Sequence, residues 1–207
     1  MTVRNALLAL LEQGPMYGYQ LRAEFERRTG ATWPLNVGQV YTTLSRLERD
    51  GFVEGLHDGV ADDEGSSQHR VMYVATAAGH EEVAAWFTTP VARTQPPRDE
   101  LAIKLALAVT VPGVDVGSVI QQQRSATISA LQDYTRLKRT RTPDVQEPAD
   151  MAWSLVLDSL VFAAEAEVRW LDHCEARLRR AQLERDSSAV GQGAPAETQT
   201  NREGTRR

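Results

Sequence analysis

Residues 36–51 read NVGQVYTTLSRLERDG, and this stretch decides the fold. With successive side chains about 100° apart, Val40, Leu44 and Leu47 fall on one face, which predicts a helix packed on a core along that side. An asparagine, a favourable N-cap residue, opens the stretch, and a glycine that can adopt the left-handed conformation closes it. We therefore expect one amphipathic helix between these two residues.

The opposite face of this helix is polar, and no acidic residue occurs on it before Glu48. Gln and Arg side chains pair bidentately with adenine and guanine edges, and Thr can contact phosphate or a thymine methyl group. The pattern is typical of a helix that reads DNA, although an ordinary amphipathic helix is the alternative on this segment alone. The polar face comprises Gly38, Gln39, Thr42, Ser45, Arg46 and Arg49.

Two helices are expected before this one. Apolar residues at helical spacing predict a helix over residues 3–11, which Gly14-Pro15 ends because proline lacks an amide donor and fixes φ. A second helix is expected from residue 16 or 17 to Gly30, where the glycine stops it. We expect Tyr19, near its start, to pack in the core.

Two strands are expected after the 36–51 helix. Residues 52–57 and 70–75 contain β-branched and aromatic residues, and the segment between them is rich in Gly, Asp and Ser. Thr76 can then cap a helix over residues 77–88. Two strands joined by a polar loop directly after a helix-turn-helix make a winged helix, so the expected fold is mostly α with a small β-wing.

At this point the chain resembles the PadR family of bacterial transcriptional regulators, from Leu7 to about Gly79. The resemblance implies a dimeric regulator, which we expect to be a repressor, with an N-terminal winged helix. It also implies release of DNA when a small aromatic or apolar effector binds. The matching residues are Tyr17-Gly18-Tyr19-Gln20-Leu21, Gly38-Gln39-Val40-Tyr41, Leu44, Arg46-Leu47-Glu48, Gly51, Arg70, Tyr73 and Thr76-Ala77-Ala78-Gly79.

The expected partner is a double-stranded DNA operator. Gln39 and Arg46 are expected to contact base edges, and the free amides at the start of the second helix suit a phosphate. The resemblance implies that Tyr41 flanks the phosphates, and we expect Arg70, on the second wing strand, to bind one. The whole expected DNA-binding set is Tyr17, Gln20, Asn36, Gly38, Gln39, Tyr41, Thr42, Thr43, Arg46 and Arg70.

A second, all-helical domain is expected after a proline-containing connection at residues 90–97. Its start resembles that of the C-terminal domain of the longer PadR-type regulators, and helices are expected over residues 97–109, 116–138 and 149–184. We place the winged helix at residues 1–95 and the helical dimerisation and effector domain at 96–185. A polar tail at 186–207, with almost no large apolar residue, is expected to be disordered.

The last helix is expected to mediate dimerisation. Between Met151 and Ala166 it carries few polar residues, so it needs more apolar covering than so small a domain supplies. A two-fold dimer would match a pseudo-palindromic operator. The residues expected to line the partner contact or the adjoining helix pair are Trp153, Leu157, Leu160, Val161, Ala164, Val168 and Leu171.

An effector site is expected where the DNA-reading domain joins the dimer arm, since a tilt there changes the half-site spacing. Aromatic walls with few polar groups suit a flat apolar ligand, although for any single one of these residues the simpler interpretation is packing of the core and interface. The candidate lining residues are Trp86, Phe87, Trp153, Phe162 and Trp170.

Several other classes of function have little support. No nucleotide-binding, serine hydrolase or zinc protease motif occurs, so no catalytic residue, cofactor or metal is expected. The single Cys174 excludes an internal disulfide framework. No apolar run reaches the roughly 20 residues of a membrane span, and no signal sequence is visible, so we expect a soluble cytoplasmic protein.

The charge balance keeps alternatives open. Residues 1–90 contain 7 Arg, no Lys and 12 acidic residues, whereas DNA-binding domains are usually basic. One alternative is therefore a winged helix used for protein–protein contact. Another is a metal-sensing regulator without a small-molecule effector, in which His57, Asp58 and His69 of the wing would be ligands.

Overall fold

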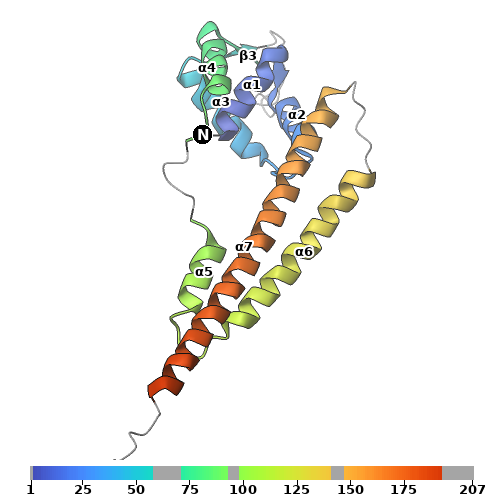
Figure 1. Ribbon diagram of the computed structural model, residues 1–207. Helices are drawn as coiled ribbons and strands as arrows, with labels where there is room; N and C mark the ends of the chain where they lie inside the picture. The colour runs from blue at the N-terminus through green and yellow to red at the C-terminus, as the bar shows by residue number, and fades with distance from the viewer. Residues whose placement is uncertain (1, 58–70, 93–97, 141–146, 193–207) are drawn as a thin grey trace, which may run out of the picture. The chain divides into compact units, whose positions relative to one another are not determined.

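The computed structural model of the protein describes residues 2–57, 71–92, 98–140 and 147–192 (Figure 1). The chain divides into two compact units. One comprises Met1–Asp99 with Asp133–Val161, and the other comprises Glu100–Gln132 with Phe162–Arg207. No helix among the described residues is long and apolar enough to cross a membrane.

The first unit begins with a bundle of short helices. They are α1 (Thr2–Leu10), a 3₁₀ turn η1 (Leu11–Gln13), α2 (Gly18–Thr29), α3 (Val37–Arg49) and α4 (Ala77–Thr88). Their apolar faces meet in one core, in which Leu7, Leu21, Leu44 and Leu47 are fully buried. The first two helices end as expected, since Gly14 follows η1 and Gly30 caps α2 in the left-handed conformation.

Helix α3 confirms the prediction made from its sequence. Val40, Leu44 and Leu47 are buried, and the Asn36 side chain accepts a hydrogen bond of 2.9 Å from the Gly38 amide. Gly51 adopts a left-handed φ of 79°, which turns the chain from α3 into the sheet.

Three short strands form an antiparallel sheet: β1 (Met16–Tyr17), β2 (Val53–His57) and β3 (Val71–Ala75). The order is β1-β3-β2, with Met16 opposite Tyr73 and Gly55 opposite the same residue from the other side. The two wing strands are confirmed, whereas β1 was not predicted. The fold is a winged helix-turn-helix followed by long helices, mostly α with a small sheet.

Helix α4 is fixed to the start of β2 by its first turn. The Thr76 hydroxyl donates to the Gly51 carbonyl at 2.7 Å and accepts from the Gly79 amide at 3.1 Å. A Cβ at position 79 would lie 2.2 Å from the Phe52 carbonyl oxygen, so only glycine permits this approach.

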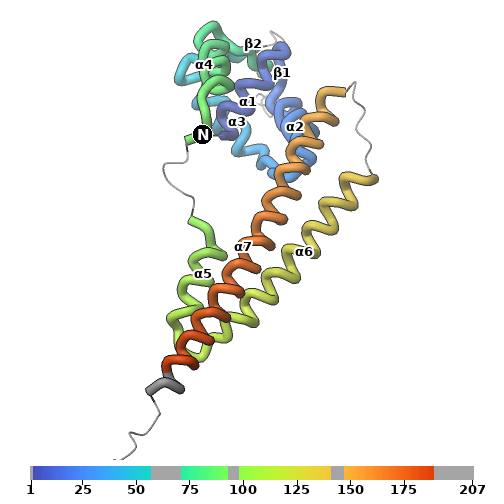
Figure 2. Tube along the Cα trace, in the orientation of Figure 1, coloured from blue at the N-terminus to red at the C-terminus, as the bar shows by residue number. Residues whose placement is uncertain are grey.

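The remaining helices are α5 (Glu100–Ala108), α6 (Val116–Thr140) and α7 (Pro148–Gln192). In the second unit, α5 and the adjoining parts of α6 and α7 run side by side (Figure 2), with Leu105, Ile120 and Leu171 as the buried core. Helix α7 is longer than predicted, because residues 186–192 are helical and not part of a disordered tail.

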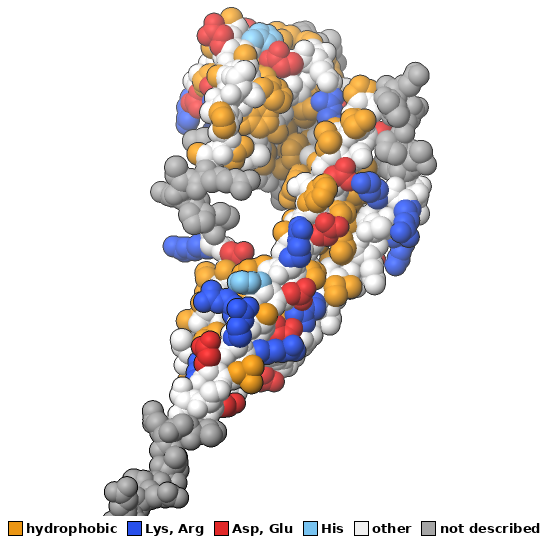
Figure 3. Space-filling model, viewed as in Figure 1, with side chains coloured by type: hydrophobic (Ala, Val, Ile, Leu, Met, Phe, Trp, Pro, Cys, Tyr) orange, Lys and Arg blue, Asp and Glu red, His pale blue; other side chains and the backbone are white. Residues whose placement is uncertain are grey.

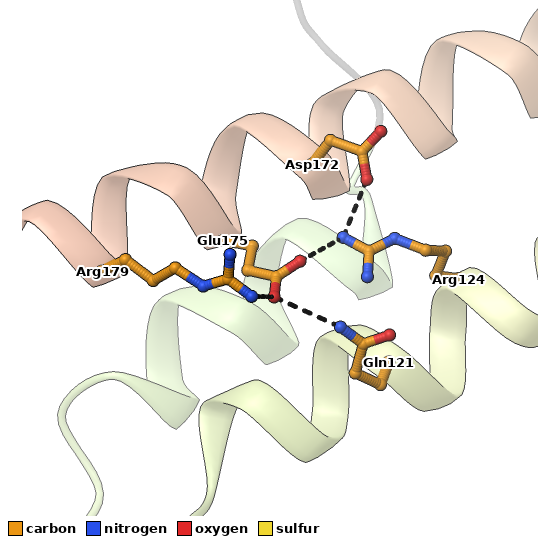
Figure 4. Close-up of polar contacts among 5 residues, drawn as sticks. All are labelled: Gln121, Arg124, Asp172, Glu175 and Arg179. Carbon is orange, nitrogen blue, oxygen red and sulfur yellow. Dashed lines mark hydrogen bonds and ion pairs between the residues drawn. The ribbon is translucent and has the colours of Figure 1, made fainter.

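A charged cluster joins α6 to α7 in the second unit (Figure 4). The Arg124 guanidinium contacts Asp172 at 2.8 Å and Glu175 at 2.6 Å, and Glu175 also accepts from Gln121 and Arg179. The hydrogen bond from Arg124 holds the pKa of Glu175 below its ordinary value, and the same bond raises the pKa of Arg124. Breaking such a half-buried cluster on one side leaves an uncompensated charge.

Helix α7 buries part of the set that was expected to line either the partner contact or the adjoining helix pair. Leu157, Ala164 and Leu171, spaced seven residues apart, are buried within the single chain. The chain's own packing therefore covers these three members of the set. Trp153, Leu160, Val161 and Val168 are half-buried.

Other apolar side chains of α7 reach the surface, where orange side chains appear among the charged ones (Figure 3). Met151 is 43% exposed, Leu155 64% and Phe162 66%. We call these three residues the exposed α7 stripe.

Candidate DNA-binding interface

The exposed face of α3 brings together much of the expected DNA-binding set. Gln39, Thr42 and Arg46 are exposed on it, beside Gly38 and Ser45. Thr43 is half-buried, and its hydroxyl donates to the Gln39 carbonyl at 2.7 Å, so it is less available to DNA than the sequence suggested. Asn36 uses its side-chain oxygen as the helix cap.

Arg46 differs from the other arginines described in residues 2–57. Each of those others pairs with a carboxylate, whereas Arg46 forms no ion pair with any residue that the structure describes. The pairs are Arg4–Glu82, Arg22–Glu26, Arg27–Glu24, Arg28–Glu24 and Arg49–Asp50. The Arg46 charge is therefore available to a nucleic acid despite the acidic composition of this region.

Glu48, the acidic residue of α3, is also engaged in a hydrogen bond within the protein. A Glu48 carboxylate oxygen accepts a hydrogen bond of 3.2 Å from the Gly55 amide of β2. This hydrogen bond connects α3 to the wing strand β2, so Glu48 has a structural role here.

The start of α2 lies directly against α3. A Cβ at Gly18 would come within 2.7 Å of the Tyr41 ring, so the two helices approach closely there. Burial raises the pKa of the half-buried Tyr41, and Tyr19 adds to the shift. A groove of about 210 Å³ lies between the two helices, lined in part by Tyr19, Arg22 and Val37.

Tyr19 corrects the expectation that it packs in the core. It is 56% exposed, and its ring stacks on that of Tyr17 with centroids 5.6 Å apart. Gln20 closes the first turn of α2, since its side-chain oxygen accepts from the Tyr17 amide at 2.9 Å. Tyr19 and Arg22 thus border the interface although neither was in the expected set.

Part of the expected set lies outside the described residues. Arg70 lies outside the described residues, as do Asp58 and His69 of the metal-sensing alternative, and the side chain of His57 is not described either. Among the residues that are described, no group of three or more His, Cys, Asp or Glu side chains could hold a metal ion.

A cavity of about 460 Å³ lies in the first unit, beside the turn between α2 and α3. Its lining includes Gly30 and Thr32 of that turn, Tyr134 of α6, and Trp153 and Leu160 of α7. The Trp153 indole covers Gly30 so closely that a Cβ there would lie 2.3 Å from the ring.

The other aromatic candidates for an effector site do not gather at this cavity. Trp86 and Phe87 contact each other with centroids 4.9 Å apart, and Phe87 is 71% exposed. Phe162 is exposed, and Trp170 lines a separate cavity in the second unit. Of the five, only Trp153 borders the cavity beside the helix-turn-helix.

Two family models match the chain, one in each half. The PadR-like family of transcriptional regulators matches residues 7–85, and the C-terminal domain of the virulence activator alpha family matches residues 97–179. The PadR-like match covers the helix-turn-helix, the wing and most of α4.

Two curated proteins are similar over most of the chain. One is the negative transcriptional regulator PadR of Bacillus subtilis, 24% identical over 82% of this chain and 93% of the relative. The other is the probable transcriptional regulator Rv1176c of Mycobacterium tuberculosis, 27% identical over 83% and 95%.

Solved structures share the fold. Bacillus subtilis PadR in complex with operator DNA matches with a TM-score of 0.62, and the same protein in complex with p-coumaric acid matches with 0.64. Both are 22% identical to this chain and cover 86% of it and 99% of the solved chain.

Proposed function

Because the chain belongs to the PadR family of transcriptional regulators, which are not enzymes, we propose that it is a ligand-responsive dimeric repressor of a pseudo-palindromic operator. The repressor role is supported by the name of the Bacillus subtilis relative, a negative regulator. The proposal keeps residues 1–95 as the DNA-binding domain and 96–185 as the dimerisation domain. It also assigns the protein to the cytoplasm, where DNA is accessible.

The observation that best supports sequence-specific DNA binding is that Arg46, unlike the other described arginines of residues 2–57, is not paired with a described carboxylate. Arg46 is exposed on α3 beside Gln39 and Thr42, and it forms no ion pair with a described residue. An unpaired guanidinium next to an exposed amide is suited to hydrogen bonding with guanine and adenine edges in the major groove. Tyr17 and Gln20 at the start of α2, together with Tyr41, are assigned to contacts with the sugar-phosphate backbone of the DNA.

The test begins with footprinting on the DNA around the protein's own gene, followed by mobility-shift titrations of the protected site. We expect protection of two half-sites, and binding that weakens steeply as salt rises because counterions are released from phosphates. Equal affinity for the protected site and a random duplex would contradict base reading. Binding without salt dependence would favour a protein–protein module.

Dimerisation is assigned to the exposed α7 stripe and to the outer side of α5, where Ile103 and Leu107 are 48% and 57% exposed. Large apolar side chains on the surface of long helices are costly in water, and a second copy would cover them. Analytical ultracentrifugation of the full chain at micromolar concentration should give a dimer mass. A monomer would contradict the proposal.

The effector is assigned to the cavity that Trp153 borders. A flat ligand there would contact Gly30 and Thr32 in the helix-turn-helix and Tyr134 on α6, so it could favour one arrangement of these elements over another. The solved complex of Bacillus subtilis PadR with p-coumaric acid makes phenolic acids the first compounds to test.

The expected result is that a phenolic acid quenches tryptophan fluorescence and releases the operator, and that Trp153→Leu abolishes both effects. Trp86→Leu serves as the matched control, because Trp86 does not line the cavity. Quenching that survives unchanged in Trp153→Leu would mean that the ligand binds elsewhere.

A further inference from the structure

A separate cavity of about 300 Å³ lies entirely within the second unit, between α5, α6 and α7. This volume is at the lower end of the range of small-molecule sites. Its lining includes the small side chains of Ala102 and Ala106 on α5 and the indole of Trp170 on α7. Its lining shares no residue with the DNA-binding face or with the cavity at Trp153.

The cavity has an apolar floor and an open mouth. Leu105 is 6% exposed and Ile120 is fully buried, and both belong to the core of this unit. Ala106 is exposed at the lip, and Trp170 and Cys174 are half-buried in the wall. An alkyl chain placed here would bury apolar surface against these side chains, which is favourable by roughly 25 cal/mol for each Å² removed from water.

The charged residue at this cavity is Arg177, which is exposed. Its neighbours on α7 and α6 are neutralised, since Arg179 pairs with Glu175 and Arg124 pairs with Asp172 and Glu175 (Figure 4). Arg177 forms no ion pair with any residue within the described ranges. A positive charge without a partner therefore lies beside an apolar hollow.

We propose that this cavity binds a small aliphatic carboxylate, with the alkyl chain between α5 and Trp170 and the carboxylate on Arg177. Arginine pairs bidentately with carboxylates, and the head group stays close to water while the chain is buried. A helix of a second copy, about 10 Å across with its side chains, is too wide to enter a hollow of this size. A bound chain would hold α5 against α6 and α7 and so stabilise the second unit.

Cys174 makes the proposal measurable, because it is the one cysteine of the chain and lines the cavity. The experiment follows the reaction of the full-length protein with 5,5′-dithiobis-(2-nitrobenzoate) while octanoate is titrated. Octanol and octyltrimethylammonium serve as neutral and cationic probes of the same chain length. We expect octanoate to slow labelling saturably and to raise the thermal unfolding midpoint, octanol to act more weakly and the cation to have no effect.

Two variants test the two parts of the site. Arg177→Gln should weaken octanoate binding about tenfold, because it removes a hydrogen-bonded charge pair, while Arg180→Gln, an exposed arginine that does not line the cavity, should leave binding unchanged. Ala106→Leu should block binding by filling the hollow. Ala106 is exposed, so this change leaves the core in place, and circular dichroism checks the fold.

Three results would overturn the proposal. They are equal protection by octanol and octanoate, unchanged octanoate binding in Ala106→Leu, and labelling that slows with protein concentration while octanoate adds nothing. The last result would mean that a second copy covers the cavity. Octanoate protection should also persist in Trp153→Leu, which separates this site from the proposed effector site.

Discussion

Replacing Arg46 with alanine should weaken operator binding and leave the fold intact. The side chain is exposed and forms no ion pair with a described residue, and alanine has the highest helix propensity. The free energy of unfolding should therefore change by less than about 0.5 kcal/mol. Loss of a bidentate contact to guanine costs about 1–3 kcal/mol, which raises the dissociation constant for the operator roughly 5- to 150-fold.

Fluorescence anisotropy with the footprinted operator and with a random duplex measures both affinities. Arg49→Ala is the matched control on the same helix, since the Arg49 guanidinium is held by Asp50 at 2.8 Å. Its effect on the operator should be smaller. If Arg46→Ala weakens both duplexes equally, Arg46 contacts the phosphate backbone and the base-reading argument is refuted. If neither affinity changes, Arg46 does not contact DNA.

Three other changes follow from the packing and the charges. Gly30→Ala should lower the free energy of unfolding by about 1–3 kcal/mol in urea denaturation, since φ is 59° and an indole covers the position, while Gly38→Ala should be neutral or stabilising. Phe162→Asp should convert the dimer to monomers in ultracentrifugation, and an unchanged mass would show that the exposed α7 stripe is not the interface. The pKa of Glu175 is lowered, so its stabilising contribution is fully present above the ordinary carboxyl pKa and is lost as the pH falls through the lowered value. Thermal unfolding of Glu175→Gln should therefore show a weaker acid dependence than that of the unmodified protein.

The elements that the sequence predicted well are those held by local patterns. The spacing of Val40, Leu44 and Leu47 and the turn at Gly51 are enough to define α3. The backbone hydrogen bonds of an α-helix join residues only four positions apart, so a local pattern suffices to predict it. Strand β1 was missed because two residues show no alternation, and the strand exists only through pairing with β3, more than fifty residues away. The C-terminal end of α7 was missed because a polar composition says little about local hydrogen bonding.

The candidate site was predicted less completely, for reasons that differ between residues. Tyr19 could have been placed correctly, since it falls opposite Leu21 and Phe25 on a helical wheel. The sequence could not predict that Arg46 lacks an ion pair with the described residues, because ion pairs such as that of Arg4 with Glu82 join distant parts of the chain. Nor can a sequence tell whether Leu157 is covered by its own chain or by a partner.

The two-residue strand β1 has a mechanical consequence for the DNA-binding domain. It makes β3 an interior strand, bonded to β2 on one side and to Met16–Tyr17 on the other. Tyr17 is also the residue that precedes the first turn of α2. The pairing of β1 with β3 therefore connects the β2–β3 strand pair to the amino end of α2, so a displacement of one is passed to the other through backbone hydrogen bonds. When the β2–β3 strand pair is oriented on a DNA duplex, the start of α2 is oriented with it. The second contact therefore costs little additional conformational entropy.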